Sequence, residues 1–257
     1  MPRVLPRSPE GARRECRQRV KKSDNVMQRY KNLFIDLDDT LYDFSAASRE
    51  AFNETYELLH YERYFDSFDQ YMSIYSPYNH ELWRIYGDGK ITKEELNRRR
   101  FSHPLEVAGV NDEELAARFC REALSRIPTK GNLVPGAVEL LEYLRPKYRM
   151  FILSNGFVEL QSRKMAAAGI DRYFDEIILS EEIGINKPRP ELFEYALKKT
   201  GSLLEESIMI GDMFDTDIKG AANIGMEQIY FNQKNEQGHT FTPTYEVKEL
   251  LQIREIL

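Results

Sequence analysis

The sequence predicts an α/β fold built on a parallel, doubly wound sheet, with an α-helical insert after the first strand. Short apolar runs are typical of buried strands, and they occur at residues 32–36, 149–153, 176–179, 207–212 and 228–231. From residue 133 onwards these runs alternate with helical patterns, which implies right-handed crossovers between parallel strands. Residues 45–130 differ, because helical spacing dominates there and few runs resemble strands.

Local patterns predict the helices of the insert and the one that follows it. Phe52 and Tyr56 recur at helical spacing after the first strand. Thr92 and Glu95 match a capping box, which favours a helix start at this point. Near residue 136 a Pro-Gly pair precedes a run of leucines along one helical face. We therefore expect a helical insert that ends before the second strand.

The later helices lie between successive strands. A helical pattern over residues 158–168 is expected to stop near Gly169. Pro190 occupies the first position of the next predicted helix, where proline is tolerated because its missing N–H has no partner anyway. A further helix is predicted over residues 217–224, before the last strand.

At 257 residues the chain is long enough to bury a substantial core, and its composition predicts a cytoplasmic globular protein. No apolar stretch is long enough to cross a bilayer, and the first residues lack the apolar run of a secretory signal. The two cysteines do not suggest a disulfide framework. The whole chain has a net charge of −6. Residues 1–26 hold eight Lys or Arg against three acids, so the remainder of the chain carries a net charge of −11. An acidic body argues against binding to a nucleic-acid backbone, and we expect no membrane partner.

These patterns divide the chain into three parts. Residues 1–26 form a basic arm that is expected to be disordered, and no function is assigned to it. Residues 27–44 and 131–257 are predicted to form the α/β core, and residues 45–130 the helical cap inserted in it. Nothing in the sequence predicts the oligomeric state.

The first chemical motif is the acidic run that follows the first strand. If the chain stays extended, Asp36 and Asp38 leave it on the same side. Crowded carboxylates are costly unless a cation compensates or one of them binds a proton, and Mg²⁺ is a cation that prefers carboxylate and phosphate oxygens. Taken alone, this motif equally fits an acidic turn at the end of a strand.

Other polar residues end the later strands. Asp212 follows the strand at 207–212, and Asp217 stands five residues further on, where a simple helix cap would also explain it. Ser154 and Asn155 follow the second strand and offer hydrogen bonds to a phosphoryl group. Lys187, in a proline-flanked loop, would neutralise charge on Asp36 and on a transferring phosphoryl group. Parallel sheets bind ligands at the carboxyl ends of their strands, so these residues are expected to converge.

In order and position, these motifs resemble those of the haloacid dehalogenase (HAD) superfamily, whose members have a Rossmann-like core and often a cap. The resemblance implies that Asp36 is a nucleophile that forms an aspartyl-phosphate, and that Asp38 is the acid and base. It further implies that Mg²⁺ is held by Asp36, the backbone carbonyl of Asp38, Asp212 and Asp217. Asp38 favours phosphate-ester hydrolysis, since a halide leaves without a proton and the dehalogenases lack this acid.

A narrower resemblance suggests the substrate. Several segments are similar to house-cleaning pyrimidine 5′-nucleotidases: parts of the cap near Trp83 and Arg100, the Ser154-Asn155-Gly156-Phe157 run with Leu160-Gln161, and residues 180–184. This implies a pyrimidine nucleoside 5′-monophosphate as the substrate. Two alternatives stay open at this stage: a phosphatase or phosphomutase of small sugar-phosphate-type metabolites, and a phospho-accepting signalling module.

Overall fold

The computed structural model describes residues 29–257, and the predicted basic arm at 1–26 lies outside them. The described residues form a six-stranded parallel sheet with the order β3-β2-β1-β4-β5-β6. Its strands are β1 (Asn32–Ile35), β2 (Arg149–Ser154), β3 (Glu176–Leu179), β4 (Ser207–Gly211), β5 (Glu227–Phe231) and β6 (Tyr245–Val247). This doubly wound order confirms the predicted fold class. Strand β6, which pairs in parallel with β5 at the sheet edge, is not among the predicted strands.

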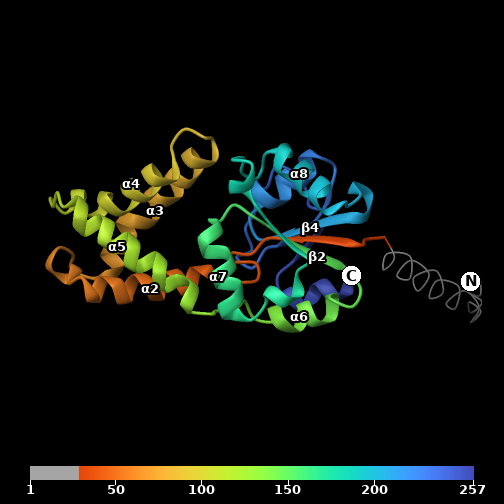
Figure 1. Cartoon of the computed structure of the whole chain (residues 1–257), viewed down its shortest axis with the longest axis horizontal. Helices are drawn as coiled ribbons and strands as arrows, with labels where there is room; N and C mark the ends of the chain where they lie inside the picture. The colour runs from red at the N-terminus through yellow and green to blue at the C-terminus, as the bar shows by residue number, and fades with distance from the viewer. Residues whose placement is uncertain (1–28) are drawn as a thin grey trace, which may run out of the picture.

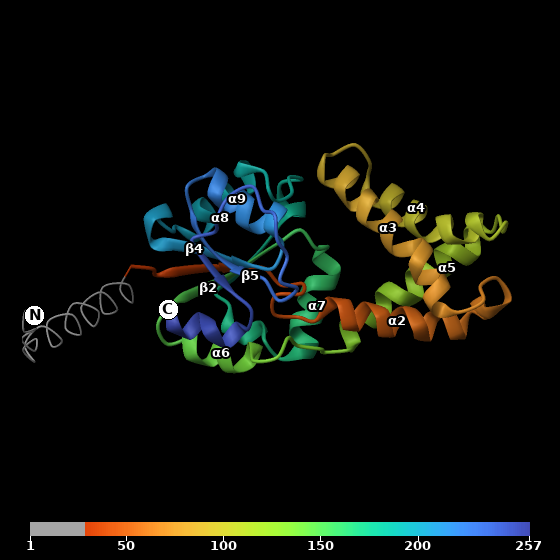
Figure 2. The same ribbon diagram turned by 180° about the vertical axis from the view of Figure 1, so that it is seen from behind.

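Strands β1 to β5 bury side chains on both faces of the sheet, which explains their nearly continuous apolar runs. In β1, Leu33 and Ile35 enter one hydrophobic cluster and Phe34 enters the other, as the alternation of a strand requires. The first cluster also packs α6 (Ala137–Leu144), α7 (Val158–Ala168) and the 3₁₀ helix η7 (Leu250–Glu255). The second packs α8 (Pro190–Thr200) and α9 (Lys219–Asn223) on the opposite face, as Figures 1 and 2 show.

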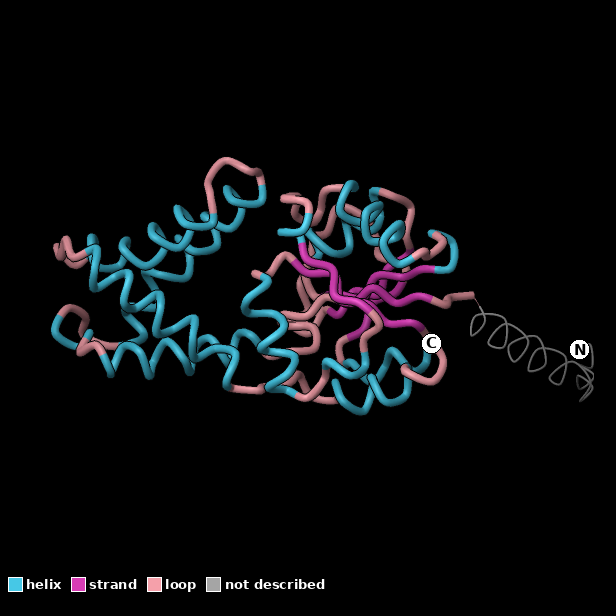
Figure 3. Tube along the Cα trace, viewed as in Figure 1, coloured by secondary structure: helices cyan, strands magenta, loops and turns pink. Residues whose placement is uncertain are grey.

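Between β1 and β2 the chain forms a helical bundle that projects from the carboxyl side of the sheet (Figures 2 and 3). Its helices are α2 (Phe44–Leu58), α3 (Phe68–Gly87), α4 (Lys93–Val107) and α5 (Glu113–Arg126). An aromatic core joins them, because Phe52, Tyr75, Phe101 and Phe119 lie with ring centroids 5.1–5.8 Å apart. The exact boundary between cap and core stays a prediction.

The tip of the cap touches the core beside β2. The Trp83 ring of α3 stacks on Phe157 with a centroid distance of 5.3 Å. Lys93, at the start of α4, bridges Glu159 at 2.7 Å and Glu181 at 2.9 Å. The cap therefore rests on the loop and helix that follow β2. Within residues 29–257, no helix combines the length and apolar character needed to span a membrane.

Candidate active site

The predicted site residues gather where three neighbouring strands end. Asp36 directly follows β1, Ser154 is the last residue of β2, and Asp212 directly follows β4. The backbone N–H of Asp36 still donates to the Ile210 carbonyl at 2.9 Å, so the strand pairing reaches the first acid. Parallel strands thus deliver these side chains to one edge of the sheet.

Three carboxylates form an acidic cluster at this edge. Asp36, Asp212 and Asp217 each offer an oxygen atom, and these atoms all lie within 4.8 Å of one another. Asp217 reaches the cluster from a π-helical turn, η6 (Phe214–Ile218), and is only 1% exposed. A side chain at Gly211 would bring a Cβ to 2.6 Å from the Asp217 Cβ, so glycine is required there for space.

Lys187 is the cation of this cluster. Its Nζ donates to Asp36 Oδ1 at 2.5 Å, to Asp217 Oδ1 at 2.7 Å and to the Leu153 carbonyl at 2.8 Å. Asn155 holds the Lys187 backbone through two hydrogen bonds, accepting from its N–H at 2.8 Å and donating to its carbonyl at 3.1 Å. Both polar ends of the Asn155 amide are therefore used to position the loop that carries Lys187.

The cluster holds three acidic groups and one ammonium, and this excess of acids is reflected in raised pKa values for two of them. Burial raises the pKa of Asp36 to about 7, with Lys187 acting in the opposite direction. Burial, with the charge of Asp36 next, raises the pKa of Asp212 to about 8. For Lys187, burial lowers the pKa, but the charges of Asp217 and Asp36 outweigh it and leave the ammonium protonated. Three carboxylates facing one ammonium provide the hard oxygen donors that suit a divalent cation such as Mg²⁺.

Asp38 lies near this cluster, but its carboxylate bonds elsewhere. Gln161 donates to Asp38 Oδ2 at 3.0 Å, and the Lys164 ammonium bonds the other oxygen, Oδ1. Gln161 also donates to Ser154 Oγ at 2.7 Å, and the same oxygen accepts from the Gly156 N–H at 3.1 Å. Ser154 and Asp38 are therefore linked through one amide group of α7.

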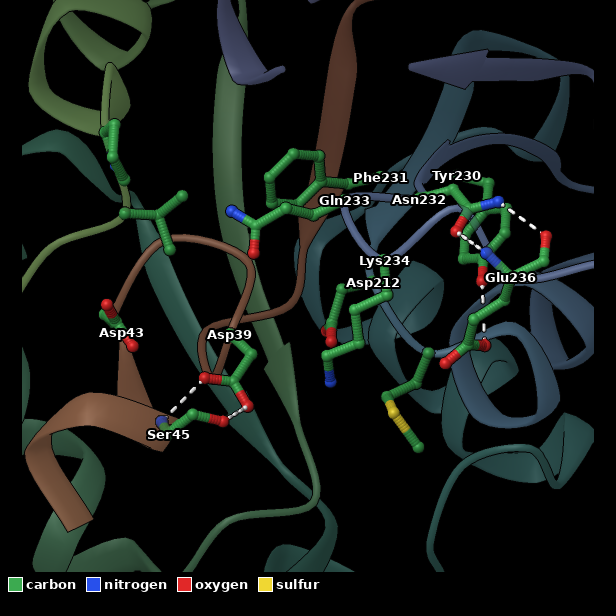
Figure 4. A pocket seen from close by; sticks show the side chains of 13 residues that line it. Asp39, Asp43, Ser45, Asp212, Tyr230, Phe231, Asn232, Gln233, Lys234 and Glu236 are labelled. Carbon is green, nitrogen blue, oxygen red and sulfur yellow. Dashed lines mark hydrogen bonds between the residues drawn. The ribbon is translucent and has the colours of Figure 1, made fainter. Parts of the chain in front are cut away.

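A small pocket opens beside the acidic cluster. Its lining includes Asp39, Ser45, Asp212 and Lys234, and Figure 4 shows the Lys234 side chain extending from the loop after β5 toward Asp212. Asp39 accepts hydrogen bonds from both the N–H and the hydroxyl of Ser45, at 2.8 and 2.7 Å. Thr40 donates to Asp212 Oδ1 at 3.1 Å, which holds that carboxylate between pocket and cluster. Of the acidic cluster, Asp212 is the member that lines this pocket.

The predicted residues fall into two groups at the sheet edge. One group surrounds Lys187 and the other surrounds Gln161; together they contain Asp36, Asp38, Ser154, Asn155, Lys187, Asp212 and Asp217. Gln161 entered the predictions only through the resemblance to pyrimidine 5′-nucleotidases, and Lys164 was not predicted as a site residue. One pattern could have indicated these two residues. Gln161 and Lys164 are three residues apart, so in a helix they lie on the same side as the apolar, buried Met165.

A family model for haloacid dehalogenase-like hydrolases matches residues 30–225, which include every residue of the two groups. The chain belongs to this family. The predicted class of enzyme, a phosphatase of the haloacid dehalogenase type, is confirmed together with the family.

Three known proteins resemble the chain over almost its whole described length. YjjG, a pyrimidine 5′-nucleotidase of Escherichia coli, is 32% identical over 88% of this chain and 96% of its own. PynA, a pyrimidine 5′-nucleotidase of Streptococcus pneumoniae, is 33% identical over 85% and 91%. The crystal structure of the HAD-hydrolase YfnB from Bacillus subtilis, bound to magnesium, has a TM-score of 0.81 at 28% identity and covers 89% of this chain and 99% of that one.

Proposed function

We propose that the protein hydrolyses phosphate monoesters through an aspartyl-phosphate formed on Asp36. The observation that supports this most is the position of Asp36, whose carboxylate shares the Lys187 ammonium with Asp217 at the end of the central strand. A carboxylate attacks without a general base, because it ionises more readily than the alcohol or thiol nucleophiles of other hydrolases. Lys187 would offset the repulsion between this carboxylate and the phosphate dianion.

The proposed reaction has two steps. In the first, an Asp36 oxygen bonds phosphorus, the bond to the leaving oxygen breaks, and that oxygen takes a proton from the Asp38 carboxyl group. In the second, water bonds phosphorus and gives its proton to the Asp38 carboxylate, while the bond to Asp36 breaks. The ester and one water become an alcohol and phosphate, and both aspartates return to their first state.

Asp36, Asp212 and Asp217, with the backbone carbonyl of Asp38, are the groups proposed to hold Mg²⁺. The carboxylate oxygens within 4.8 Å of one another and the excess of acidic groups support this choice, as does the magnesium bound in YfnB. When bound, the ion would supply positive charge against the phosphoryl oxygens. Ser154 and Asn155 are proposed to contact the phosphate, and their side chains also bond Gln161 and the Lys187 backbone.

The proposed substrate is a pyrimidine nucleoside 5′-monophosphate. Its support is the similarity to YjjG and PynA, whose names assign them that class of substrate. A small sugar phosphate is the alternative substrate, and a phosphomutase is the alternative reaction. A signalling module that stores the phosphoryl group is disfavoured by Asp38, because a base beside the acyl-phosphate would discharge it.

The test is a panel of phosphorylated metabolites that includes UMP, dUMP and sugar phosphates, with released phosphate as the readout. We expect the fastest hydrolysis with UMP or dUMP, loss of activity in EDTA, and loss in Asp36→Asn. The matched control is Asp215→Asn, which removes an exposed acid from the same turn as Asp217 and should keep its activity. Strong activity on a sugar phosphate with almost none on nucleotides would reject the proposed substrate. An active Asp36→Asn would reject the mechanism.

A further inference from the structure

The inward side of α7 carries two polar side chains that are almost completely buried. Gln161 is 0% exposed and Lys164 is 1% exposed. Burying an ammonium and an amide is costly unless each finds strong partners. Their partners are Asp38, in the loop after β1, and Ser154, the last residue of β2, both at the active edge of the sheet. Helix α7 therefore connects residues that the sheet alone would not connect.

The two side chains hold both oxygens of the Asp38 carboxylate. Gln161 Nε2 bonds Oδ2 at 3.0 Å, and the Lys164 Nζ bonds Oδ1. Residues three apart lie on one side of a helix, so a single helix supplies both donors. The Lys164 ammonium is itself fixed between rings, since it lies 4.8 Å from the Phe44 ring centroid and 5.4 Å from that of Tyr42. The orientation of Asp38 is thereby set by rigid neighbours.

The loop before α7 is shaped to admit Gln161. A Cβ at Gly156 would overlap the Gln161 amide, so a residue larger than glycine would displace it. The Gly156 backbone does not require glycine for its conformation, because its φ is not positive. Glycine is needed at this position for space alone. The hydrogen bonds of Gln161 to Asp38 and Ser154 thus depend on a missing side chain.

The first turn of the same helix meets the cap. Phe157, the residue before α7, stacks on Trp83, and Glu159 pairs with Lys93. Helix α7 therefore contacts the cap at its start and Asp38 further along its inward side. A displacement of this helix would change both contacts together.

We infer that Gln161 and Lys164 are positioning residues that hold the Asp38 carboxyl group at the leaving oxygen of the substrate. This inference rests on the proton transfer proposed for Asp38. Gln161 fixes the distance between Asp38 and Ser154, so the proton donor and the phosphate-binding hydroxyl are placed as one unit. Lys164 holds the other oxygen of the same carboxyl group. Neither residue forms a bond to the substrate.

The experiment compares two leaving groups in the first turnover of the Mg²⁺-loaded enzyme. Uridine needs a proton to leave UMP, whereas p-nitrophenol leaves p-nitrophenyl phosphate as a stable phenolate that needs none. Rapid quenching measures the release of each before the aspartyl-phosphate is hydrolysed. In Lys164→Met and in Gln161→Met we expect uridine release to slow at least about 100-fold, the lower range for losing general acid catalysis. Release of p-nitrophenolate should change by less than about three-fold, because it needs no proton donor.

Two further variants guard this comparison against misfolding. Gly156→Ala displaces the Gln161 amide without changing α7, and it should show the same dependence on the leaving group. Lys164→Arg keeps the positive charge and should recover part of the rate for uridine. The matched control is Arg163→Met, which removes an exposed cation from the same helix and should behave as the wild type.

Three results would overturn the inference. An equal loss of rate with both leaving groups would indicate a structural role for Gln161 and Lys164. An unchanged or faster release of uridine would indicate that their contacts with Asp38 play no part in the proton transfer. Normal uridine release in Gly156→Ala would separate Gln161 from the proton transfer. The comparison needs any alkyl phosphate that the enzyme accepts, so it stands if UMP is not the substrate. Failure of the proposed mechanism would appear separately, as activity in Asp36→Asn.

Discussion

Removing one acid from the metal-free cluster should stabilise the protein. The substitution is Asp212→Asn, whose amide oxygen can still accept the hydrogen bond that Thr40 donates to Asp212 Oδ1 at 3.1 Å. The pKa of Asp212 is raised to about 8 by burial and by Asp36, so the folded protein binds more protons than the unfolded chain between about pH 4 and pH 8. The stability of the metal-free wild type therefore falls as the pH rises through this window.

The structure sets the size of the effect. One pKa unit corresponds to about 1.4 kcal/mol. The rise of the Asp212 pKa from 3.8 to about 8 therefore sets an upper limit of about 6 kcal/mol on the free energy of unfolding that is lost when Asp212 is charged above pH 8. The substitution recovers only part of this free energy. The amide must itself be buried, and the pKa of Asp36, which is raised to about 7, falls again when its neighbour loses its charge. We expect Asp212→Asn to gain about 1–3 kcal/mol at pH 8, as replaced buried charges often do.

Urea unfolding in EDTA measures this gain at pH 8 and at pH 5. At pH 5 the folded protein keeps its proton on Asp212 and only about one unit of the pH 4–8 window has been crossed, so the gain should fall to roughly a third of its value at pH 8. Mg²⁺ at pH 8 should stabilise the wild type and leave the variant almost unchanged. Asp215→Asn, exposed in the same turn as Asp217, should stay within about 0.5 kcal/mol of the wild type. A variant that is less stable in EDTA at pH 8, or that keeps the full gain from Mg²⁺, would refute the reasoning.

Two more predictions concern Lys187 in the acidic cluster and Lys93 at the contact between the cap and the core. Lys187→Met should destabilise the metal-free protein by about 3–5 kcal/mol in urea at pH 8, because the ammonium that Asp36 and Asp217 share is lost; unchanged stability would contradict this. Lys93→Met removes the bridge to Glu159 and Glu181 and should cost less than about 1 kcal/mol in stability, as partly exposed pairs do. The same variant should raise the KM for the substrate by up to about five-fold and leave kcat unchanged. A lower kcat with an unchanged KM would contradict a role of Lys93 in holding the cap against the core.

Much of the fold follows from local sequence patterns. The strands ending at Asp36, Ser154 and Asp212 were predictable because buried parallel strands are short apolar runs and ligands gather at their carboxyl ends. Pro190 opens α8 as its fixed φ suggested. The edge strand β6 escaped prediction because it has three residues and one buried side chain, so it shows no apolar run.

The site was predictable as a set of residue types, but its contacts were not. Asn155 illustrates the difference, since its amide bonds the Lys187 backbone 32 residues away in the sequence. Lys164 is 126 residues from Asp38 and resembles any solvated lysine of a helix until α7 is packed against the sheet. Which side of that helix faces inward depends on the whole core, and no window of sequence contains that information.

The sequence by itself determined that Asp36, Ser154 and Asp212 stand at the ends of strands, because the apolar pattern of each strand is local. Only the tertiary structure decided which of them share partners. It placed Asp36 and Asp217 on one ammonium and turned Asp38 to another, on α7. The physical reason is that the direction of a buried carboxylate is set by the donors around it, and those donors come from distant segments that meet only when the sheet and its helices pack together.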